Sequence, residues 1–362
     1  MIRRDKQKRL EDMATLAEDA AYKGDHGILY KITKQVCARF RNSTEAPITN
    51  KEGQLLTSEF EKEARWTEHF HEILNRQAPD TETIIQEAEE DLDVVTRVPT
   101  RQEIMRAIKS LRNNNAPGPD GLNAEFFKAD PELAAEVLLP LLTKAGKEKI
   151  PEEWNEGVII KIPKKGNLSD CNNWRGIILL SIPSKVLAKI VIGRISGAID
   201  RKLREEQAGF RPGRGCTDQI FTLRNIIEQC TEWQRDLYMY INFVDFEKVF
   251  DSVHRHSLWK ILRYYGIPSE IVSMIKCFYN NFSCKVGNSQ NSFPVLSGVR
   301  QGCVMSALLF SLAIDWVMRQ TTENQNRGIR WNLFTNLEDL DFADDLALLS
   351  HTHHHIQEKL VD

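Results

Sequence analysis

The chain has 362 residues, of which 41% are hydrophobic and 27% charged, a composition typical of a folded globular protein of about two domains. Its formal net charge of −3 does not indicate a nucleic-acid-binding protein, so the distribution of charge along the chain has to be considered. The seven cysteines show no metal-binding spacing, which speaks against a zinc centre and a disulfide framework.

Residues 1–76 are predicted to form a helical N-terminal segment. Trp66, Phe70 and Leu74 recur at helical spacing near its end, and this pattern predicts a packing face. The segment that follows, residues 77–99, is predicted to be an acidic linker, because residues 80 to 97 contain one base and seven acids (1 − 7 = −6).

The next helix is predicted to begin after Thr100. Thr100 and Glu103 have the spacing of a capping box, which predicts a helix to about Arg112. Residues 113–121 form a loop rich in Asn, Pro and Gly, which are turn-forming residues. A second helix is predicted over residues 131–149.

Two cations on a hairpin are candidates for binding a triphosphate. Residues 157–162 read as a strand, Lys165 lies in the following turn, and Arg175 lies on the predicted returning strand. Arginine can bond phosphate oxygens in bidentate fashion. Lys164 is the alternative to Lys165, and a solvated surface role stays open for each lysine. Residues 158–235 are basic as a whole (14 − 7 = +7).

A buried helix and a phosphate-contacting loop are predicted next. The helix covers Ile177–Ile199, where apolar residues recur at helical spacing. Residues 207–215 are rich in Gly and Arg but match no established phosphate-loop motif. Arg211 and Arg214 are therefore predicted to contact the backbone of a nucleic acid.

Asp245 ends a predicted buried strand, residues 237–244, which is rich in β-branched and aromatic residues. A helix is predicted to follow over Val253–Tyr265, and Asp251 could serve as a helix N-cap. The most apolar stretch, Val304–Met318, is too short to span a bilayer and is predicted to be a buried helix.

Residues 340–349 predict a β-hairpin with Asp344 and Asp345 at its turn. A solvated Asp-Asp turn is the commoner explanation of such a pair. Together with Asp245 at a strand end, however, the pair could hold two divalent cations for in-line phosphoryl transfer.

A series of blocks then identifies a family. In chain order they are Asn113–Gly121, Trp174–Ile177, Gln207–Gln219, the stretch around Asp245, Gly298–Cys303 and Phe342–Asp345. Each block alone is moderate evidence, but the ordered set is specific. It resembles the reverse transcriptase of a non-LTR (LINE-type) retrotransposon, near the RTE-like or jockey-like groups.

The resemblance implies an α+β right-hand polymerase fold after the helical N-terminal segment. It places a fingers extension at residues 100–144 and a reverse transcriptase domain at residues 145–362, with fingers at 145–235 and palm at 236–362. The thumb is expected to be missing, so the chain is expected to be C-terminally truncated.

The resemblance also implies the roles of individual residues. Asp245, Asp344 and Asp345 would be catalytic and, with the carbonyl of Phe246, would hold two Mg²⁺ ions, for which Mn²⁺ could substitute. Phe250 would exclude a 2′-OH from the nucleotide pocket, a selection through steric clash. The remaining expected contacts are Lys165, Arg175, Gln301 and Gly302 to the nucleotide, and Asn115, Gly118, Arg211 and Arg214 to the template-primer.

The expected partners are an RNA template, a DNA primer or target, a dNTP and a ribonucleoprotein with element RNA, but no membrane. An intracellular location in the nucleus and cytoplasm is expected, without a recognised targeting signal. Two residues depart from the family pattern: Val249 stands where Ala is usual, and Ala307 where Pro is usual. The histidines within residues 351–355 are interpreted as an exposed run in preference to a metal-binding tract.

Two alternatives stay open. The chain could be a truncated or co-opted copy that binds RNA without polymerising, which Val249 and the expected loss of the thumb favour. An RNA-dependent RNA polymerase is disfavoured by Phe250, because such an enzyme must accept a 2′-OH.

Overall fold

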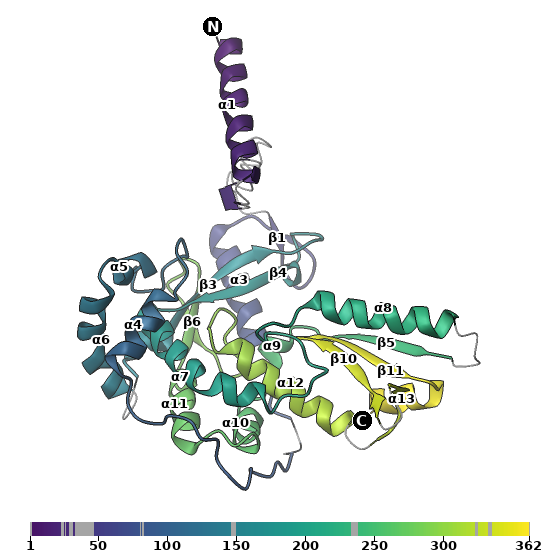
Figure 1. The fold of residues 1–362 in the computed structure, drawn as a ribbon. Helices are drawn as coiled ribbons and strands as arrows, with labels where there is room; N and C mark the ends of the chain where they lie inside the picture. The colour runs from purple at the N-terminus through teal and green to yellow at the C-terminus, as the bar shows by residue number, and fades with distance from the viewer. Residues whose placement is uncertain are drawn as a thin grey trace. The chain divides into compact units, whose positions relative to one another are not determined.

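The computed structural model describes residues 2–22, 25, 27–28, 32, 47–79, 81, 83–145, 150–232, 238–322, 325–331 and 335–361. It contains two compact units, Met1–Ile48 and Thr49–Asp362. The first contains helix α1 (Ile2–Tyr22). The second contains mixed helices and sheets (Figure 1), as expected for an α+β fold.

The prediction of helix over residues 1–76 is confirmed in α1 and in α3 (Glu59–Leu74), where Trp66, Phe70 and Leu74 are buried. It is wrong where β1 (Ile48–Thr49) and β2 (Leu55–Leu56) form a two-stranded sheet. A turn joins these strands, with Gly53 at φ 82°, a conformation that glycine adopts without steric cost. Residues 33–46 lie outside the described part of the chain.

The predicted capping box is confirmed. Thr100 Oγ1 accepts a hydrogen bond from Glu103 N (3.3 Å), and Glu103 Oε2 accepts one from Thr100 N (2.8 Å). The helix that it begins ends at Lys109, short of the predicted end. The helices of this region are α4 (Arg101–Lys109), α5 (Ala124–Ala129), α6 (Pro131–Ala145) and α7 (Ile182–Asp200), and they pack together at one end of the second unit (Figure 1).

A four-stranded sheet in the order β4-β3-β6-β7 adjoins these helices. Its strands are β3 (Glu156–Pro163), β4 (Trp174–Leu179), β6 (Ser283–Val286) and β7 (Ser292–Pro294). β3 and β4 are antiparallel, with Ile162 opposite Arg175, so the predicted hairpin with a cation on its returning strand is confirmed. Short 3₁₀ turns precede β3 (Glu152–Asn155) and β4 (Cys171–Asn173).

The predicted helix Ile177–Ile199 begins later than expected. Ile177 and Ile178 pair with Ile160 and Ile159 in the sheet, and α7 starts only at Ile182. β-branched residues fit a pleated surface well, and the Pro that follows Ile182 favours a helix start there. The helical spacing of the apolar residues therefore extended the prediction across a strand.

The second sheet has the order β10-β11-β5 and is antiparallel throughout. Its strands are β5 (Tyr240–Asp245), β10 (Asp339–Phe342) and β11 (Asp345–Ser350). The predicted hairpin is thus confirmed, with Ala343 and Asp344 in its turn. Asp345, which was also predicted at the turn, instead begins β11. The strand predicted over residues 237–244 is confirmed from Tyr240 onwards, whereas Tyr238 and Met239 lie before it and Leu237 lies outside the described residues. Its predicted burial is wrong, because every residue of β5 is partly or largely exposed.

Both faces of this sheet carry apolar residues. Leu346 and Leu348 belong to the main core with α10 (Arg255–Tyr264) and α12 (Ser306–Thr322). Ala347 and Leu349 point to the opposite face, because side chains alternate along a strand, and pack against Ile226 of α8 (Cys216–Glu232). The sheet that carries the acids is therefore held between helices, as Figure 1 shows for α8 and α12.

Buried ion pairs anchor strand β10 from behind. Arg204 Nη1 donates to both oxygens of Asp339 (2.9 and 2.8 Å), and Nη2 donates to Asp341 (2.6 Å). The Arg204 backbone N–H and side chain also contact Asp315 of α12 (3.0 and 3.3 Å). All three carboxylates are almost fully buried. This cluster, Arg204 with the three acids, fixes β10 to the helices beneath it.

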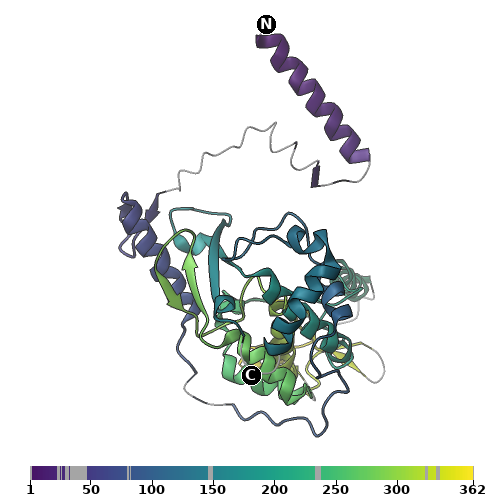
Figure 2. The same cartoon turned by 90° about the vertical axis from the view of Figure 1, so that its left-hand side faces the viewer.

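The acidic segment predicted as a linker follows the surface of the second unit in an extended path (Figure 2). Arg263 of α10 pairs with Glu87 (3.1 Å) and Asp91 (2.8 Å). Leu92 N also donates to Gly266 O (2.6 Å). The segment is thus bound along α10, and its described residues belong to the same compact unit as the flanking parts.

The remaining elements complete the second unit. The helix predicted over Val253–Tyr265 is confirmed as α10, and the predicted buried helix appears as α12. A short helix that was not predicted, α9 (Val249–Ser252), precedes α10. The others are α11 (Ser269–Tyr279), β8 (Ile329–Arg330), β9 (Asn336–Leu337) and α13 (His353–Val361). Among the described residues, no helix is long and apolar enough to cross a membrane.

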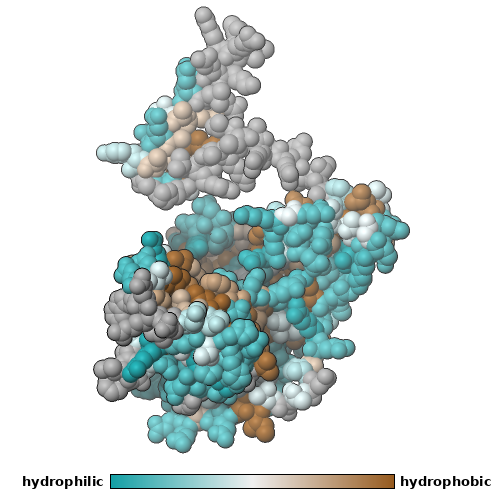
Figure 3. Space-filling view, turned by 90° about the vertical axis from the view of Figure 1, so that its right-hand side faces the viewer, coloured by the Kyte–Doolittle hydropathy of each residue, from teal (hydrophilic) through white to brown (hydrophobic). Residues whose placement is uncertain are grey.

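One face of the molecule is mainly hydrophilic with separate hydrophobic patches (Figure 3). Exposed aromatic side chains occur on α8, at Phe221 (64% exposed), and on β5, at Phe243 (70% exposed). Phe243 precedes Asp245 by two positions and therefore lies on the same face of β5. An exposed ring thus adjoins the strand end that carries the first acid.

Candidate active site

Asp245 and Asp345 lie directly opposite each other. Asp245 ends β5, Asp345 begins β11, and the two are partners in the antiparallel register. Side chains of such partners share a face, with Cβ atoms about 4.5–5.5 Å apart, and two like charges there are mutually destabilising. Both residues are exposed. The pair therefore favours a bound cation.

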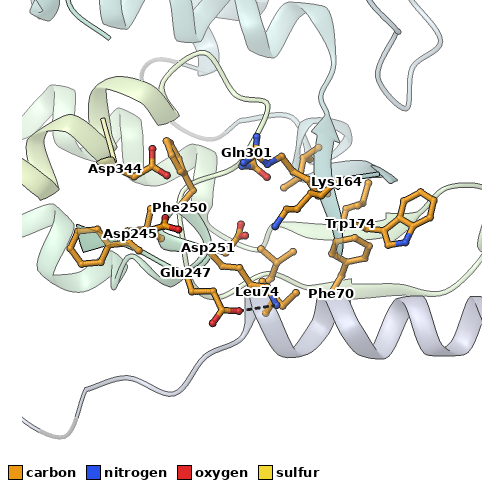
Figure 4. A pocket seen from close by; sticks show the side chains of 18 residues that line it. Phe70, Leu74, Lys164, Trp174, Asp245, Glu247, Phe250, Asp251, Gln301 and Asp344 are labelled. Atoms are coloured by element: carbon orange, nitrogen blue, oxygen red, sulfur yellow. Dashed lines mark ion pairs between the residues drawn. The ribbon is translucent and has the colours of Figure 1, made fainter. Parts of the chain in front are cut away.

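Asp344 occupies the turn beside this pair. It follows Ala343, which has a left-handed backbone at φ 59°, a conformation that is unfavourable for residues with a Cβ. Asp344 and Asp245 both line a cavity of about 310 Å³. Figure 4 shows them on the same side of the cavity, with Phe250 beside them.

The donor set has the chemistry that a hard divalent cation prefers, which is oxygen in place of nitrogen or sulfur. Asp245, Asp344 and Asp345 form no ion pair with any described lysine or arginine, so no cation in the described part of the chain pairs with them. Three acids do not converge, however: in the described part of the chain, no group of three His, Cys, Asp or Glu side chains could hold a metal ion. Asp345 does not line the cavity, whereas Phe246 does.

Cations face these acids across the cavity. Lys164 and Arg175 line it, but Lys165 does not, so the structure favours the alternative lysine over the first choice. The reason is that Lys164 N donates to Asn173 O (2.8 Å), which continues the β3–β4 ladder by one residue and holds Lys164 near Arg175. Lys165 falls in the turn and is exposed.

Asp251 is a cavity residue that the sequence interpretation missed. It lies inside α9, whose N-cap is Lys248, so its interpretation as an N-cap is wrong. Burial raises the pKa of Asp251 to about 6, although Arg76, Lys248 and other cations act to lower it. The only sequence signal for this position was its place in the block around Asp245.

Lys248 also lines the cavity and was not predicted to do so. It has a left-handed backbone (φ 53°), and its Nζ donates to Asn172 Oδ1 (2.7 Å). Burial lowers the pKa of its ammonium group. Its position at the sharp turn after β5 brings a further cation to the cavity.

Phe250 is held by other rings. It stacks on Phe310 with ring centroids 4.3 Å apart and meets Phe210 edge-on at 6.2 Å. Phe250, Val249 and Gln301 line the cavity, as labelled for two of them in Figure 4. Val249, which stands where the family pattern has Ala, therefore lies at the cavity wall.

Gly302 does not line the cavity but supports it. Its φ is 115°, and a Cβ there would lie 2.4 Å from Ile178 O. Ile178 N donates to Gln301 O (2.7 Å). Only glycine permits this approach, which places Gln301 beside β4.

The predicted template contact at Arg211 is contradicted. Its side chain is buried, Nε donates to Asp200 (2.7 Å), and its Nη atoms donate to the carbonyls of Arg204, Gln207 and Asp200. A guanidinium committed to internal acceptors is not available to a phosphate. Its Gly/Arg-rich surroundings suggested a phosphate-contacting loop, but the Arg211 side chain is directed into the protein.

The other predicted template contacts are placed away from the cavity. Arg214 is half-buried and donates to Glu205 O (2.6 Å). Gly118 packs so closely on the residues between β4 and α7 that a Cβ would lie 2.4 Å from the carbonyl carbon of Leu180. Asn115 is exposed, and its predicted contact stays a prediction.

The histidine run lies at the end of β11 and the start of α13. His353 and His354 are exposed, as predicted, and His354 pairs with Glu358 (3.2 Å). His351 instead bonds Arg330 N through Nε2 (3.2 Å). These partners give the run a structural role at the edge of the sheet.

Comparison with known proteins identifies the family of the chain. Residues 162–362 match the family "Reverse transcriptase (RNA-dependent DNA polymerase)". Over 220 residues the chain is 31% identical to the transposon TX1 uncharacterized 149 kDa protein of Xenopus laevis, covering 60% of the chain and 17% of that protein. Over 289 residues it is 27% identical to the retrovirus-related Pol polyprotein from type-2 retrotransposable element R2DM of Drosophila melanogaster, covering 78% of the chain and 26% of that protein.

A third relative is the probable RNA-directed DNA polymerase from transposon BS of Drosophila melanogaster, 29% identical over 220 residues, or 58% of the chain and 24% of that protein. The chain thus spans at most about a quarter of the length of these relatives. The family match covers more than half of the chain and includes both strands that carry the acids. The chain therefore belongs to the reverse transcriptase family, in its non-LTR retrotransposon branch.

Proposed function

We propose that this chain is an RNA-directed DNA polymerase that transfers nucleotides to a primer 3′-OH on an RNA template. The observation that carries the proposal is that Asp245 and Asp344 line one side of a cavity whose lining also contains Lys164 and Arg175. Asp345 lies opposite Asp245 in the adjoining sheet. In this arrangement uncompensated acids and cations face each other across a space, as transfer of a phosphoryl group requires.

The carboxylates of Asp245, Asp344 and Asp345 would hold two Mg²⁺ ions, or Mn²⁺ in their place. When bound, such cations activate the attacking hydroxyl and stabilise the charge on the leaving pyrophosphate. The backbone of Phe246 lies at the same strand end and would complete the oxygen donors. The reverse transcriptase family uses divalent cations; the identity and number of the ions here are our proposal.

The nucleotide would enter the cavity with its triphosphate towards Lys164 and Arg175. Phe250, fixed by its stacking on Phe310, would lie under the sugar and exclude a 2′-OH. Gln301 would contact the nucleotide from the opposite wall. Phe243, exposed on the same face as Asp245, offers a surface on which a base of the primer or template could stack.

The architecture follows from these roles. Residues 145–235, with the β3–β4 hairpin, would form the fingers, and residues 236–362, with the three-stranded sheet, would form the palm. Residues 100–144 would extend the fingers. Assembly with element RNA into a ribonucleoprotein and an intracellular location, in the nucleus and cytoplasm, remain proposals from the sequence.

Primer extension by the purified chain tests the proposal. We expect the chain to extend a DNA primer on an RNA template with dNTPs and Mg²⁺ or Mn²⁺, and EDTA should abolish the product. A folded chain that yields no product with either metal would refute the proposal for this chain. A folded chain that still binds the RNA would support the second candidate function, RNA binding without polymerisation, which Val249 at the cavity wall favours.

A lysine pair provides a sharper test of the nucleotide-binding role. Lys164→Ala is expected to raise KM for dNTP by roughly tenfold, because one charge-assisted phosphate contact is lost. Lys165→Ala, its matched control in the adjacent turn, should change KM by less than about twofold. Steady-state primer extension measures both. Equal effects of the two substitutions, or a larger effect at Lys165, would contradict the placement.

A further inference from the structure

The start of the Gly/Arg-rich loop and the residue before it are bonded to the hairpin that carries Asp344. Ala208 N donates to Asp341 O (2.9 Å), and Asp341 N donates to Glu206 O (3.1 Å). Gly209 approaches the turn so closely that a Cβ would lie 2.1 Å from Ala343 N. Residues more than 130 positions apart in sequence thus share one tightly packed region.

The side chain of Gln207 extends this contact to the turn itself. It is fully buried (0% exposed). Its Oε1 accepts from Ala343 N (3.0 Å) and from Gly209 N (2.7 Å), while Nε2 donates to Ala343 O (3.4 Å). One amide therefore reaches both backbone groups of the residue that precedes Asp344.

The residue held in this way has an unfavourable backbone. Ala343 is at φ 59°, and a residue with a Cβ leaves the left-handed region readily unless its surroundings hold it there. The direction of the Asp344 side chain depends on this dihedral angle, since Asp344 is the next residue. A polar side chain that bonds both the N–H and the C=O of Ala343 resists its rotation.

We propose that Gln207 is a positioning residue that sets the direction of the Asp344 carboxylate by clamping the backbone of Ala343. It does not touch substrate or cation and acts only through the turn. The proposal deepens the polymerase function proposed above and rests on it. Partners that orient a ligand to a metal commonly change metal affinity or activity by about 10- to 100-fold when they are removed.

Gln207→Met is the principal variant, because methionine has a similar length but neither accepts nor donates effectively here. Gln219→Met is the matched control: Gln219 Nε2 bonds Glu206 O (2.8 Å) and Asp341 O (3.4 Å) but no atom of Ala343. Gln207→Glu tests the two accepted bonds by themselves, since a carboxylate still accepts from Ala343 N and Gly209 N but cannot donate to Ala343 O. If Gln207→Met fails to fold, Gln207→Asn, which is too short to reach Ala343, takes its place.

Two readouts on the full chain separate positioning from mere structural support. The first is the Kd for Mn²⁺ alone, measured by electron paramagnetic resonance. The second is the split between kcat and KM in primer extension, with thermal melting as a check on folding. We expect Gln207→Met to raise the Kd for Mn²⁺ at least fivefold and lower kcat at least tenfold, with KM for dNTP within about twofold of wild type. Gln219→Met should match wild type, and Gln207→Glu should recover most of the loss.

The proposal is overturned if Gln207→Met keeps wild-type Mn²⁺ affinity and kcat, or if Gln219→Met loses as much as it does. If the wild-type chain binds Mn²⁺ but does not extend a primer, the proposed function fails, and the Mn²⁺ affinities alone decide the role of Gln207. A wild-type chain that neither binds Mn²⁺ nor extends a primer overturns both proposals.

Discussion

Asp245→Asn is expected to lower primer extension by on the order of 10²–10³-fold or more, because it removes a charge that would stabilise the transition state through bound cations. The side chain keeps its shape, so the protein should fold normally. Its melting temperature should be unchanged or slightly higher, since the repulsion between Asp245 and Asp345 is removed. Loss of activity without loss of stability is the signature of a functional acid.

Asp93→Asn is the matched control for this substitution. Asp93 is exposed and lies in the acidic segment, away from the cavity. It should leave both kcat and the melting temperature unchanged. Substantial activity in the Asp245→Asn protein would contradict the catalytic assignment. A clear fall in its melting temperature would show that Asp245 has a structural role.

Arg204→Met is expected to have the largest effect on stability. Removing the guanidinium leaves Asp339, Asp341 and Asp315 without their shared partner. Breaking a buried ion pair by removing one partner costs about 3–5 kcal/mol. Urea unfolding of wild type and variant at pH 7.5 measures this loss. Arg224→Met removes an exposed ion pair with Glu228 and is the control, which should cost less than about 1 kcal/mol.

The stability lost in the Arg204→Met variant should depend on pH. Burial and the neighbouring Asp339 raise the pKa of Asp341 well above its usual value, while Arg204 acts to lower it. A carboxyl with a raised folded-state pKa contributes stability that is lost as pH rises through that pKa. Without Arg204 the pKa of Asp341 rises further, so the variant should lose more stability than wild type between pH 5 and 8. If urea unfolding at pH 5 and at pH 8 shows the same difference in unfolding free energy between variant and wild type, Asp341 does not titrate in this range.

Local patterns in the sequence predicted the elements that carry the acids. Two short apolar runs on either side of Asp344 and Asp345 predicted the hairpin, and a β-branched and aromatic stretch predicted the strand that ends at Asp245. Both are observed. Short apolar runs bounded by turn residues, and enrichment in β-branched residues, are properties of the local sequence, so they can be recognised without the tertiary structure. The family was recognised from the order of short sequence blocks, which is also visible in the sequence alone.

Local patterns failed where the same residues fit two different local structures. Ile177 and Ile178 fit the spacing of the following helix, but their β-branched side chains pair with β3. Lys164 and Lys165 are equivalent as neighbours in sequence, and only the continuation of the ladder to Asn173 separates them. Such outcomes depend on where the partner strand ends, and a short stretch of sequence does not contain that information.

The sequence by itself determined which residue types could carry the chemistry: the three carboxylates, the hairpin cations and the aromatic residue after β5. Only the tertiary structure decided which polar groups are committed internally. Arg211 was expected at a phosphate but donates to Asp200, while Gln207, not singled out as a side chain, bonds Ala343 136 positions away. A buried donor must find an acceptor wherever the fold brings one, and that partner is specified by packing, because sequence distance places no limit on it.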